Sequence, residues 1–161
     1  GDAMFREIRR SKNKITDENI KNLLKNARIG IFAVNGDCGY PYAIPMNFLY
    51  DEGNNSIYMH SAKVGHKVDS LRNSDKVCFT VIGEEKIKEE DWAPFVESVI
   101  AFGKCKKVDD EKRALEILKE FAMKYYPSEH LVDEHILKSG KACNIYVIDI
   151  EDIKGKEVKE K

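Results

Sequence analysis

The sequence predicts a mainly β (α+β) protein in which six antiparallel strands form a barrel with flanking helices. Three observations lead to this fold class. Short apolar runs at strand spacing dominate the middle of the chain, and turns rich in Gly, Asn and Asp separate them. These runs do not alternate with crossover helices, as a parallel Rossmann-type sheet would require. A sheet of six strands must protect its edges, and closure into a barrel is the usual solution.

Residues 16–39 predict a helix followed by a strand. The hydroxyl of Thr16 can cap the free backbone N–H groups of a first helical turn. Apolar residues then recur at helical spacing as far as Ala27. The apolar, β-prone run at 29–34 predicts a strand, and the glycine-rich segment 35–39 ends it.

A hairpin and a short helix are expected next. Apolar runs at 40–50 and 56–61 flank a five-residue loop that contains Gly53, which is the usual pattern of two hairpin strands. Residues 62–73 place their apolar side chains on one helical face.

Two further strands, at 76–82 and 95–108, enclose a charged loop. The second of them alternates apolar residues with other residue types. The intervening segment 83–91 is nearly all charged, and we expect a solvated and mobile loop there.

Two helices and a strand complete the chain. The longest helix begins at Asp109 and Asp110 and must end before Pro127. A shorter helix runs from Ser128 to Gly140, where glycine is a good C-terminal stop. The last strand covers 143–150.

Length and composition indicate one domain over residues 1–161. The chain has 161 residues, of which 42% are hydrophobic and 34% charged. This length is ordinary for one domain, and this balance is not that of a disordered chain. Residues 1–3, before Met4, resemble a cloning remnant, and residues 154–161 are expected to form a charged tail.

The composition also excludes several partners. Lys and Arg number 27 against 28 for Asp and Glu, so the chain lacks the positive excess of a general nucleic-acid binder. No apolar run approaches the roughly 20 residues of a membrane span, and the start lacks the apolar core of a signal peptide. The four cysteines lack the spacing of a zinc site or a disulfide framework. We expect a cytoplasmic protein that binds no metal, nucleic acid or membrane.

The segment from Tyr58 to Asp69 is the densest candidate site. Its expected helix start exposes free N–H groups, which favour an anion. A serine hydroxyl, a lysine ammonium and two imidazoles lie beside that start, and glycine allows close approach of a ligand to the backbone. These residues, His60, Ser61, Gly65, His66 and Lys67, predict a phosphate site. The alternative is that the serine only caps the helix and the lysine is solvated.

The strand at 42–48 is a second candidate. It is apolar on both faces and contains Pro45, a residue confined mainly to strand edges and bulges. Backbone polar groups near Met46 and Asn47 would then be free to meet a flat heteroaromatic ring. The alternative is an ordinary core strand with a proline at its edge.

Outside these segments, the acidic and histidine residues at 130–135 suggest a metal site. A solvated helix face explains them better, because no third ligand has matching spacing.

Three segments resemble the pyridoxamine 5'-phosphate oxidase-like FMN-binding split-barrel family, in particular its nitroimidazole-resistance (Nim-type) branch. They are the proline strand at 41–48, the His-Ser-Ala and Gly-x-Lys block at 57–71, and the strand at 98–104. The likeness extends over residues 5–150.

The resemblance implies a six-stranded antiparallel split β-barrel of Greek-key type and a homodimer with FMN at its interface. It implies that one strand lines the isoalloxazine ring and that the helix start holds the phosphate. It also implies that Trp92 and the Phe102–Gly103 strand approach the flavin of the other subunit, although Trp92 could instead anchor its own strand. The cofactor-binding residues are then Ile44, Pro45, Met46, Asn47, His60, Ser61, Ala62, Gly65, His66, Lys67 and Trp92.

The function that the resemblance implies is an FMN-dependent oxidoreductase. Electrons from reduced nicotinamide or another donor would pass through FMN to a small-molecule acceptor, as in a nitroreductase. His60 is the candidate proton donor, with a structural role as the alternative. The ending at 154–161 lacks the pattern of true pyridoxamine phosphate oxidases, so vitamin B6 oxidation is not expected. The alternatives are a non-catalytic flavin carrier or redox sensor and a haem protein with an axial histidine, the candidates being His60, His66, His130 and His135.

Overall fold

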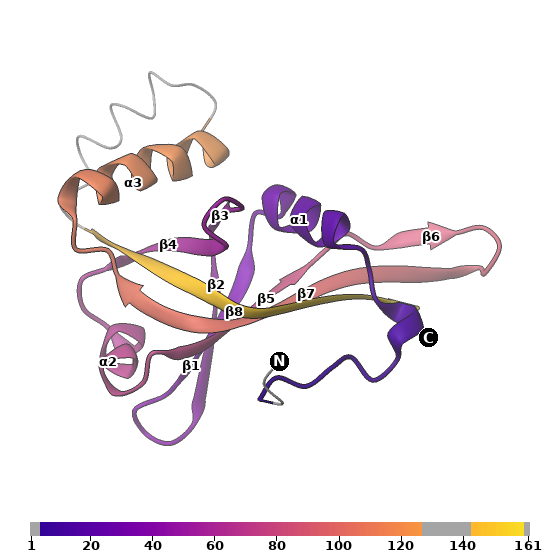
Figure 1. The fold of residues 1–161 in the computed structure, drawn as a ribbon, viewed down its shortest axis with the longest axis horizontal. Coiled ribbons are helices and arrows are strands. Elements are labelled where there is room, and N and C mark those ends of the chain that lie inside the picture. The colour runs from indigo at the N-terminus through magenta and orange to yellow at the C-terminus, as the bar shows by residue number, and fades with distance from the viewer. Residues whose placement is uncertain (1–3, 127–142, 160–161) are drawn as a thin grey trace.

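The computed structural model describes residues 4–126 and 143–159. One antiparallel sheet with the strand order β2-β1-β5-β7-β8-β4-β3 forms its centre, and β6 pairs with β7 beside this path (Figure 1). The strands are β1 Gly30–Asn35, β2 Pro41–Met46, β3 Leu49–Asp51, β4 Ser56–Ala62, β5 Lys76–Ile82, β6 Lys86–Lys88, β7 Ala93–Lys107 and β8 Cys143–Lys159. The helices are the 3-10 turn Ser11–Asn13 and α1 Asp17–Asn26, α2 His66–Asn73 and α3 Glu111–Tyr125.

The mainly β prediction is confirmed, and the six expected strands are the six long ones. The two additional strands, β3 and β6, have three residues each. The run at 40–50 was predicted as one strand, but the chain leaves the ladder at Asn47 and Phe48. There the Phe48 N–H donates to the Tyr125 hydroxyl at 3.0 Å, and the Phe48 carbonyl accepts from the Lys124 ammonium at 3.0 Å. Side chains of α3 thus replace the strand partner at this break.

The prediction of a charged tail at 154–161 is wrong for its described part. Strand β8 continues to Lys159, which lies opposite Phe95 of β7. Gly155 is buried in this stretch, and a Cβ at this position would lie only 2.7–2.8 Å from Ile20 and Ile15, so only glycine fits against α1 there. The charged neighbours of Gly155 extend a long strand that charge alone does not reveal.

The segment 83–91 is not a simple loop either, since β6 pairs with Ala93–Phe95 of β7. Two ion pairs accompany this hairpin. Lys86 lies 3.2 Å from Glu97, and Lys88 contacts Glu157. The predicted exposure is confirmed for most residues of the segment.

Helix α2 starts later than the predicted residue 62. Strand β4 continues to Ala62, which lies opposite Cys143 of β8. The helix begins only after Gly65, whose φ of 142° is a conformation that residues other than glycine rarely adopt. The loop between the strand and the helix therefore has three residues.

The predicted boundaries of the other described helices agree with the structure. The Thr16 hydroxyl accepts from the Asn19 N–H at 3.1 Å and caps α1, as predicted. Helix α3 ends at Tyr125, before Pro127. The predicted helix from Ser128 to Gly140, with its histidines, lies outside the described residues.

Two apolar clusters hold the described chain together. The larger packs the inner face of the sheet against α1 and α2 and includes Leu24, Phe32, Phe48, Phe79 and Val68. The smaller joins β4 and β8 to α3 through Tyr58, Ile117, Ile145 and Val147. None of the described helices is long and apolar enough to cross a membrane.

Candidate functional site

Strand β2 forms one end of the sheet, with β1 as its partner. Pro45 lies opposite Ile31 and is exposed, whereas Ile44 and Met46 are half-buried and pack against the main core. An edge position accommodates proline, because the missing N–H costs no ladder hydrogen bond there. The predicted edge proline is confirmed, and no strand of the described chain covers the outer edge of β2.

The start of α2 differs from the starts of the other two described α-helices. The Thr16 side chain caps α1, and the Asp110 side chain accepts from two N–H groups at the start of α3. At α2 the cap residue is Gly65, which supplies no side-chain hydrogen bond. No atom lies within 4 Å of where a Cβ of Gly65 would be, so the backbone is open there. Free N–H groups in an open position suit an anion.

Lys67 supplies a positive charge at the same helix start. Its side chain is partly buried, and that burial lowers the pKa of the ammonium below its ordinary value of 10.5. Within residues 4–126 and 143–159, no carboxylate lies within ion-pair distance of it. A desolvated ammonium without a counter-ion favours the arrival of an anion, because the anion restores its lost stabilisation.

His66 connects this helix start to β2. Its ring stacks on Tyr42 with centroids 4.0 Å apart, and its Nε2 lies 3.2 Å from an Asp37 oxygen. Tyr42 belongs to β2, two residues before Ile44. The stack therefore brings His66, at the start of α2, beside the proline strand, although the two segments lie about twenty residues apart in the chain.

His60 and Ser61 do not face the same way. The His60 ring is exposed and lies edge-on to Phe121 of α3, with centroids 4.8 Å apart. Ser61 is buried, and its hydroxyl donates to the Ala62 carbonyl at 2.9 Å. Because neighbouring strand residues point to opposite faces, one ligand cannot meet both side chains from one side of β4.

Trp92 lies far from this region within one chain. It occupies the turn between β6 and β7, is 92% exposed and has a φ of 49°. Figure 1 places the β6–β7 hairpin and α2 at opposite ends of the molecule. Any contact between Trp92 and a ligand at α2 must therefore come from a second chain.

Cations and aromatic rings form a cluster near Asn47 that was not predicted from the sequence. The Arg28 guanidinium lies over the Tyr125 ring at 4.7 Å, and the Lys124 ammonium lies over the Phe48 ring at 4.1 Å. The Asn47 amide donates to the Arg28 carbonyl at 2.9 Å. No sequence signal reveals this cluster, because α3 reaches the strand break only through the fold.

Lys124 should react as an unusually acidic ammonium. Burial, reinforced by the nearby Arg28 charge, lowers its pKa to about 8. Competitive labelling with trace acetic anhydride, followed by peptide mass spectrometry, measures the pKa of each lysine. We expect a midpoint near pH 8 for Lys124, with exposed Lys112 as the internal control. A Lys124 midpoint near the ordinary value of 10.5 would contradict the burial seen here.

Replacing Gly65 with alanine should destabilise the start of α2. The φ of 142° with ψ of 177° belongs to a region that is essentially restricted to glycine, and occupying it costs other residues about 1–3 kcal/mol. Urea unfolding measures the loss in the free energy of unfolding. Gly53→Ala is the matched control, because that residue lacks a positive φ and its nearest neighbour would be 3.6 Å away. Equal effects of the two substitutions would show that the backbone at residue 65 is not strained.

Comparison with known proteins gave a family match and several structural neighbours. The family model described as pyridoxamine 5'-phosphate oxidase matches residues 16–157. A candidate 5-nitroimidazole antibiotic resistance protein from Bacteroides thetaiotaomicron has 21% identity and a TM-score of 0.75, over 89% of this chain and 85% of that one. The FAD and haem binding protein from Mycobacterium smegmatis has 16% identity and a TM-score of 0.73, over 94% and 75%.

A third neighbour, a FAD-binding protein from Mesorhizobium loti, has 19% identity and a TM-score of 0.63, over 90% of this chain and 96% of that one. No curated protein matches the chain. At these identities the structures agree in fold, and the antiparallel sheet with its flanking helices matches split-barrel proteins.

Proposed function

The chain belongs to the pyridoxamine 5'-phosphate oxidase-like family, and we propose that it is an FMN-dependent oxidoreductase of the nitroreductase type. Several neighbours of this fold bind a flavin by description. The observation that carries the proposal is the uncapped start of α2 with Lys67, which lacks a counter-ion among the described residues. This arrangement suits the phosphate of FMN.

The residues present fit such a cofactor. Lys67 and the first N–H groups of α2 would hold the phosphate, with Gly65 leaving room for it. The edge strand from Ile44 to Asn47 would lie along the isoalloxazine ring through its backbone. His60 and Ser61 contribute less directly in this arrangement, because they face opposite sides of β4. Bound FMN would supply the transfer of electrons between two substrates.

The protein's own part in the reaction is to bind and orient. The Tyr42 stack and the Asp37 carboxylate fix the His66 imidazole between β2 and α2. Partial burial desolvates the Lys67 ammonium and lowers its pKa, and a phosphate beside it would compensate for that desolvation. No described side chain at α2 is required as an obligatory acid or base.

We also propose that the protein is a homodimer. The outer face of the sheet carries Ile31, Ile82, Ile100 and Phe102, which are between 36% and 60% exposed. They share one face, because Thr80 lies opposite both Ile31 and Ile100 in the registers. An apolar face of this extent on a sheet fits a second copy of the chain. Trp92 of the partner subunit could then reach a flavin that is remote from it in its own chain.

Anaerobic reduction tests the enzymatic proposal. FMN-loaded protein is mixed with NADH or NADPH, and the flavin absorbance is followed before and after adding a nitroaromatic acceptor. Bleaching by the donor and recovery with the acceptor are expected from the oxidoreductase. A flavin that stays bound but reacts with neither compound would favour the carrier or sensor alternative. A Soret band after haem addition would favour the haem alternative, which the haem-binding neighbour keeps open.

A further inference from the structure

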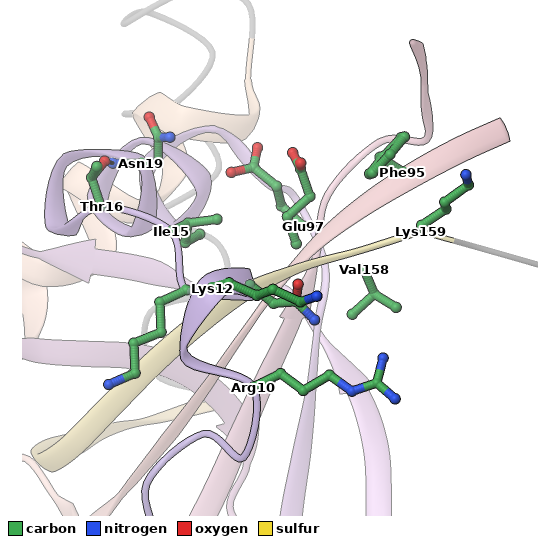
Figure 2. A pocket seen from close by; sticks show the side chains of 12 residues that line it. Arg10, Lys12, Ile15, Thr16, Asn19, Phe95, Glu97, Val158 and Lys159 are labelled. Atoms are coloured by element: carbon green, nitrogen blue, oxygen red, sulfur yellow. Dashed lines mark hydrogen bonds between the residues drawn. The ribbon is translucent and has the colours of Figure 1, made fainter. Parts of the chain in front are cut away.

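A groove of about 790 Å³ lies between the N-terminal segment, the start of α1, the start of β7 and the end of β8. In Figure 2, Arg10 and Lys12 lie on one side of it, and Phe95 and Lys159 lie on the other. The apolar residues of its lining are Ile15, Phe95 and Val158. It shares no lining residue with β2 or α2, so within one chain it is separate from the candidate flavin site.

The charge of this groove is positive. Four of its lining residues are cations, namely Arg10, Lys12, Lys14 and Lys159. Its two acids, Glu97 and Glu157, are already paired with lysines that do not line it, Lys86 and Lys88. The local excess contrasts with the net charge of −1 for the whole chain.

Two of the four cations lack a counter-ion within the described chain. Lys14 lies 3.4 Å from Glu7, and Lys159 lies 3.9 Å from Asp91, so these two have exposed partners. For Arg10 and Lys12, no ion pair is formed within residues 4–126 and 143–159, and both side chains are exposed. Their charges are available to a ligand.

The N-terminal segment is held against β8 beside the groove. Lys14 and Lys156 are opposite each other in an isolated antiparallel bridge, and the Ile15 N–H donates to the Gly155 carbonyl at 3.2 Å beside it. Lys14 is paired with Glu7 and Lys156 does not line the groove, so this contact fixes the backbone of the groove wall and adds no free charge to it.

We propose that this groove binds a phosphorylated small molecule that carries at least two phosphate groups. Two neighbouring cations suit the charge of a diphosphate, and charge-assisted hydrogen bonds from Arg10 and Lys12 would hold it. The volume is that of an ordinary ligand pocket, so there is room for more than the phosphates. The apolar residues of the lining would contact the remainder of the ligand. The source of the diphosphate, inorganic or nucleotide, is decided by the experiment.

Isothermal titration calorimetry with inorganic pyrophosphate and with ADP tests this site. The protein is used with whatever flavin it retains after gel filtration. Arg10→Gln together with Lys12→Gln should weaken binding about tenfold or more, as expected for losing charge-assisted hydrogen bonds. Both side chains are exposed, so the double variant should unfold at the same temperature as the wild type. The matched control is Lys112→Gln with Lys119→Gln, an equal loss of charge on exposed positions of α3.

The outcomes separate clearly. Tighter binding of ADP than of pyrophosphate would identify a nucleotide site, and equal binding would identify a site for the diphosphate alone. The titrations are repeated on FMN-saturated protein, in which the start of α2 would be occupied, and unchanged affinities there distinguish this groove from the flavin site. No binding to the wild type, or equal weakening by the α3 control, would overturn the proposal.

Discussion

Lys67→Gln should weaken FMN binding by about tenfold to a hundredfold, the range expected for a hydrogen bond to a charged group worth about 1.5–3 kcal/mol. Lys67 is the cation at the uncapped start of α2, and burial lowers its pKa. Glutamine keeps most of the length of the side chain and can still donate a hydrogen bond. The substitution therefore removes the charge rather than the packing. Fluorescence titration of FMN into the purified variants measures the affinity.

The same substitution should not destabilise the protein in the absence of flavin. The ammonium of Lys67 has a lower pKa in the folded chain than in the unfolded one, so the unfolded chain binds the proton more tightly. As long as the ammonium is protonated, this difference opposes folding, and a neutral side chain removes it. Urea unfolding of the flavin-free variant should show an unchanged or increased free energy of unfolding. A large decrease would mean that a lost affinity reflects unfolding.

Arg72→Gln is the matched control for the affinity measurement. Arg72 lies in the last turn of the same helix, is exposed and is 3.7 Å from Asp69. Its loss removes the same charge from α2 but at the end where no phosphate is expected. Equal losses of FMN affinity in the two variants would contradict a phosphate site at the start of α2.

Ile82→Asp should convert the proposed dimer to a monomer. Ile82 is 60% exposed on the outer face that also carries Ile31, Ile100 and Phe102. In a dimer that buries this face, the substitution would place a carboxylate without a partner in an apolar interface, which is strongly unfavourable. Sedimentation velocity over a range of concentrations measures the change. The folded monomer should survive, because the side chain is exposed in the single chain.

Leu115→Asp is the control for this experiment. Leu115 is 53% exposed, but it lies on α3, away from the outer face of β1, β5 and β7. We expect this variant to remain a dimer. A wild-type protein that sediments as a monomer, or an Ile82→Asp variant that stays dimeric, would refute this face as the interface.

The fold could be predicted from the sequence where local signals agree with the packing. Strand β5 shows this well, because alternating residues such as Val77, Phe79 and Val81 are buried and their neighbours are not. The caps at Thr16 and Asp110 also follow from local chemistry. The edge strand β2 was recognisable because proline has few other places in a sheet.

The errors arose where distant partners decide the structure. The charged residues from Lys154 to Lys159 form a strand because β7 is long enough to pair with them. The break at Asn47 and Phe48 depends on Tyr125, whose place over the strand no local pattern reveals. Charge and short-range periodicity cannot report such pairings, since the partners are about fifty to eighty residues away.

The candidate site divides in the same way. The Gly-His-Lys sequence predicted an anion site at a helix start, and the structure has an uncapped start there. The stack of His66 on Tyr42, which joins this start to β2, required the fold. His60 and Ser61 lie in β4, as predicted, and their opposite orientations follow from the alternation of side chains along a strand, which separates two residues that were predicted to share one site.

The central claim is a flavin site formed by β2 and the start of α2. The most direct test is the visible absorption spectrum of the purified protein after addition of FMN and gel filtration. We predict a retained flavin spectrum at about one FMN per chain. Protein that emerges colourless from the column after FMN addition would contradict the claim.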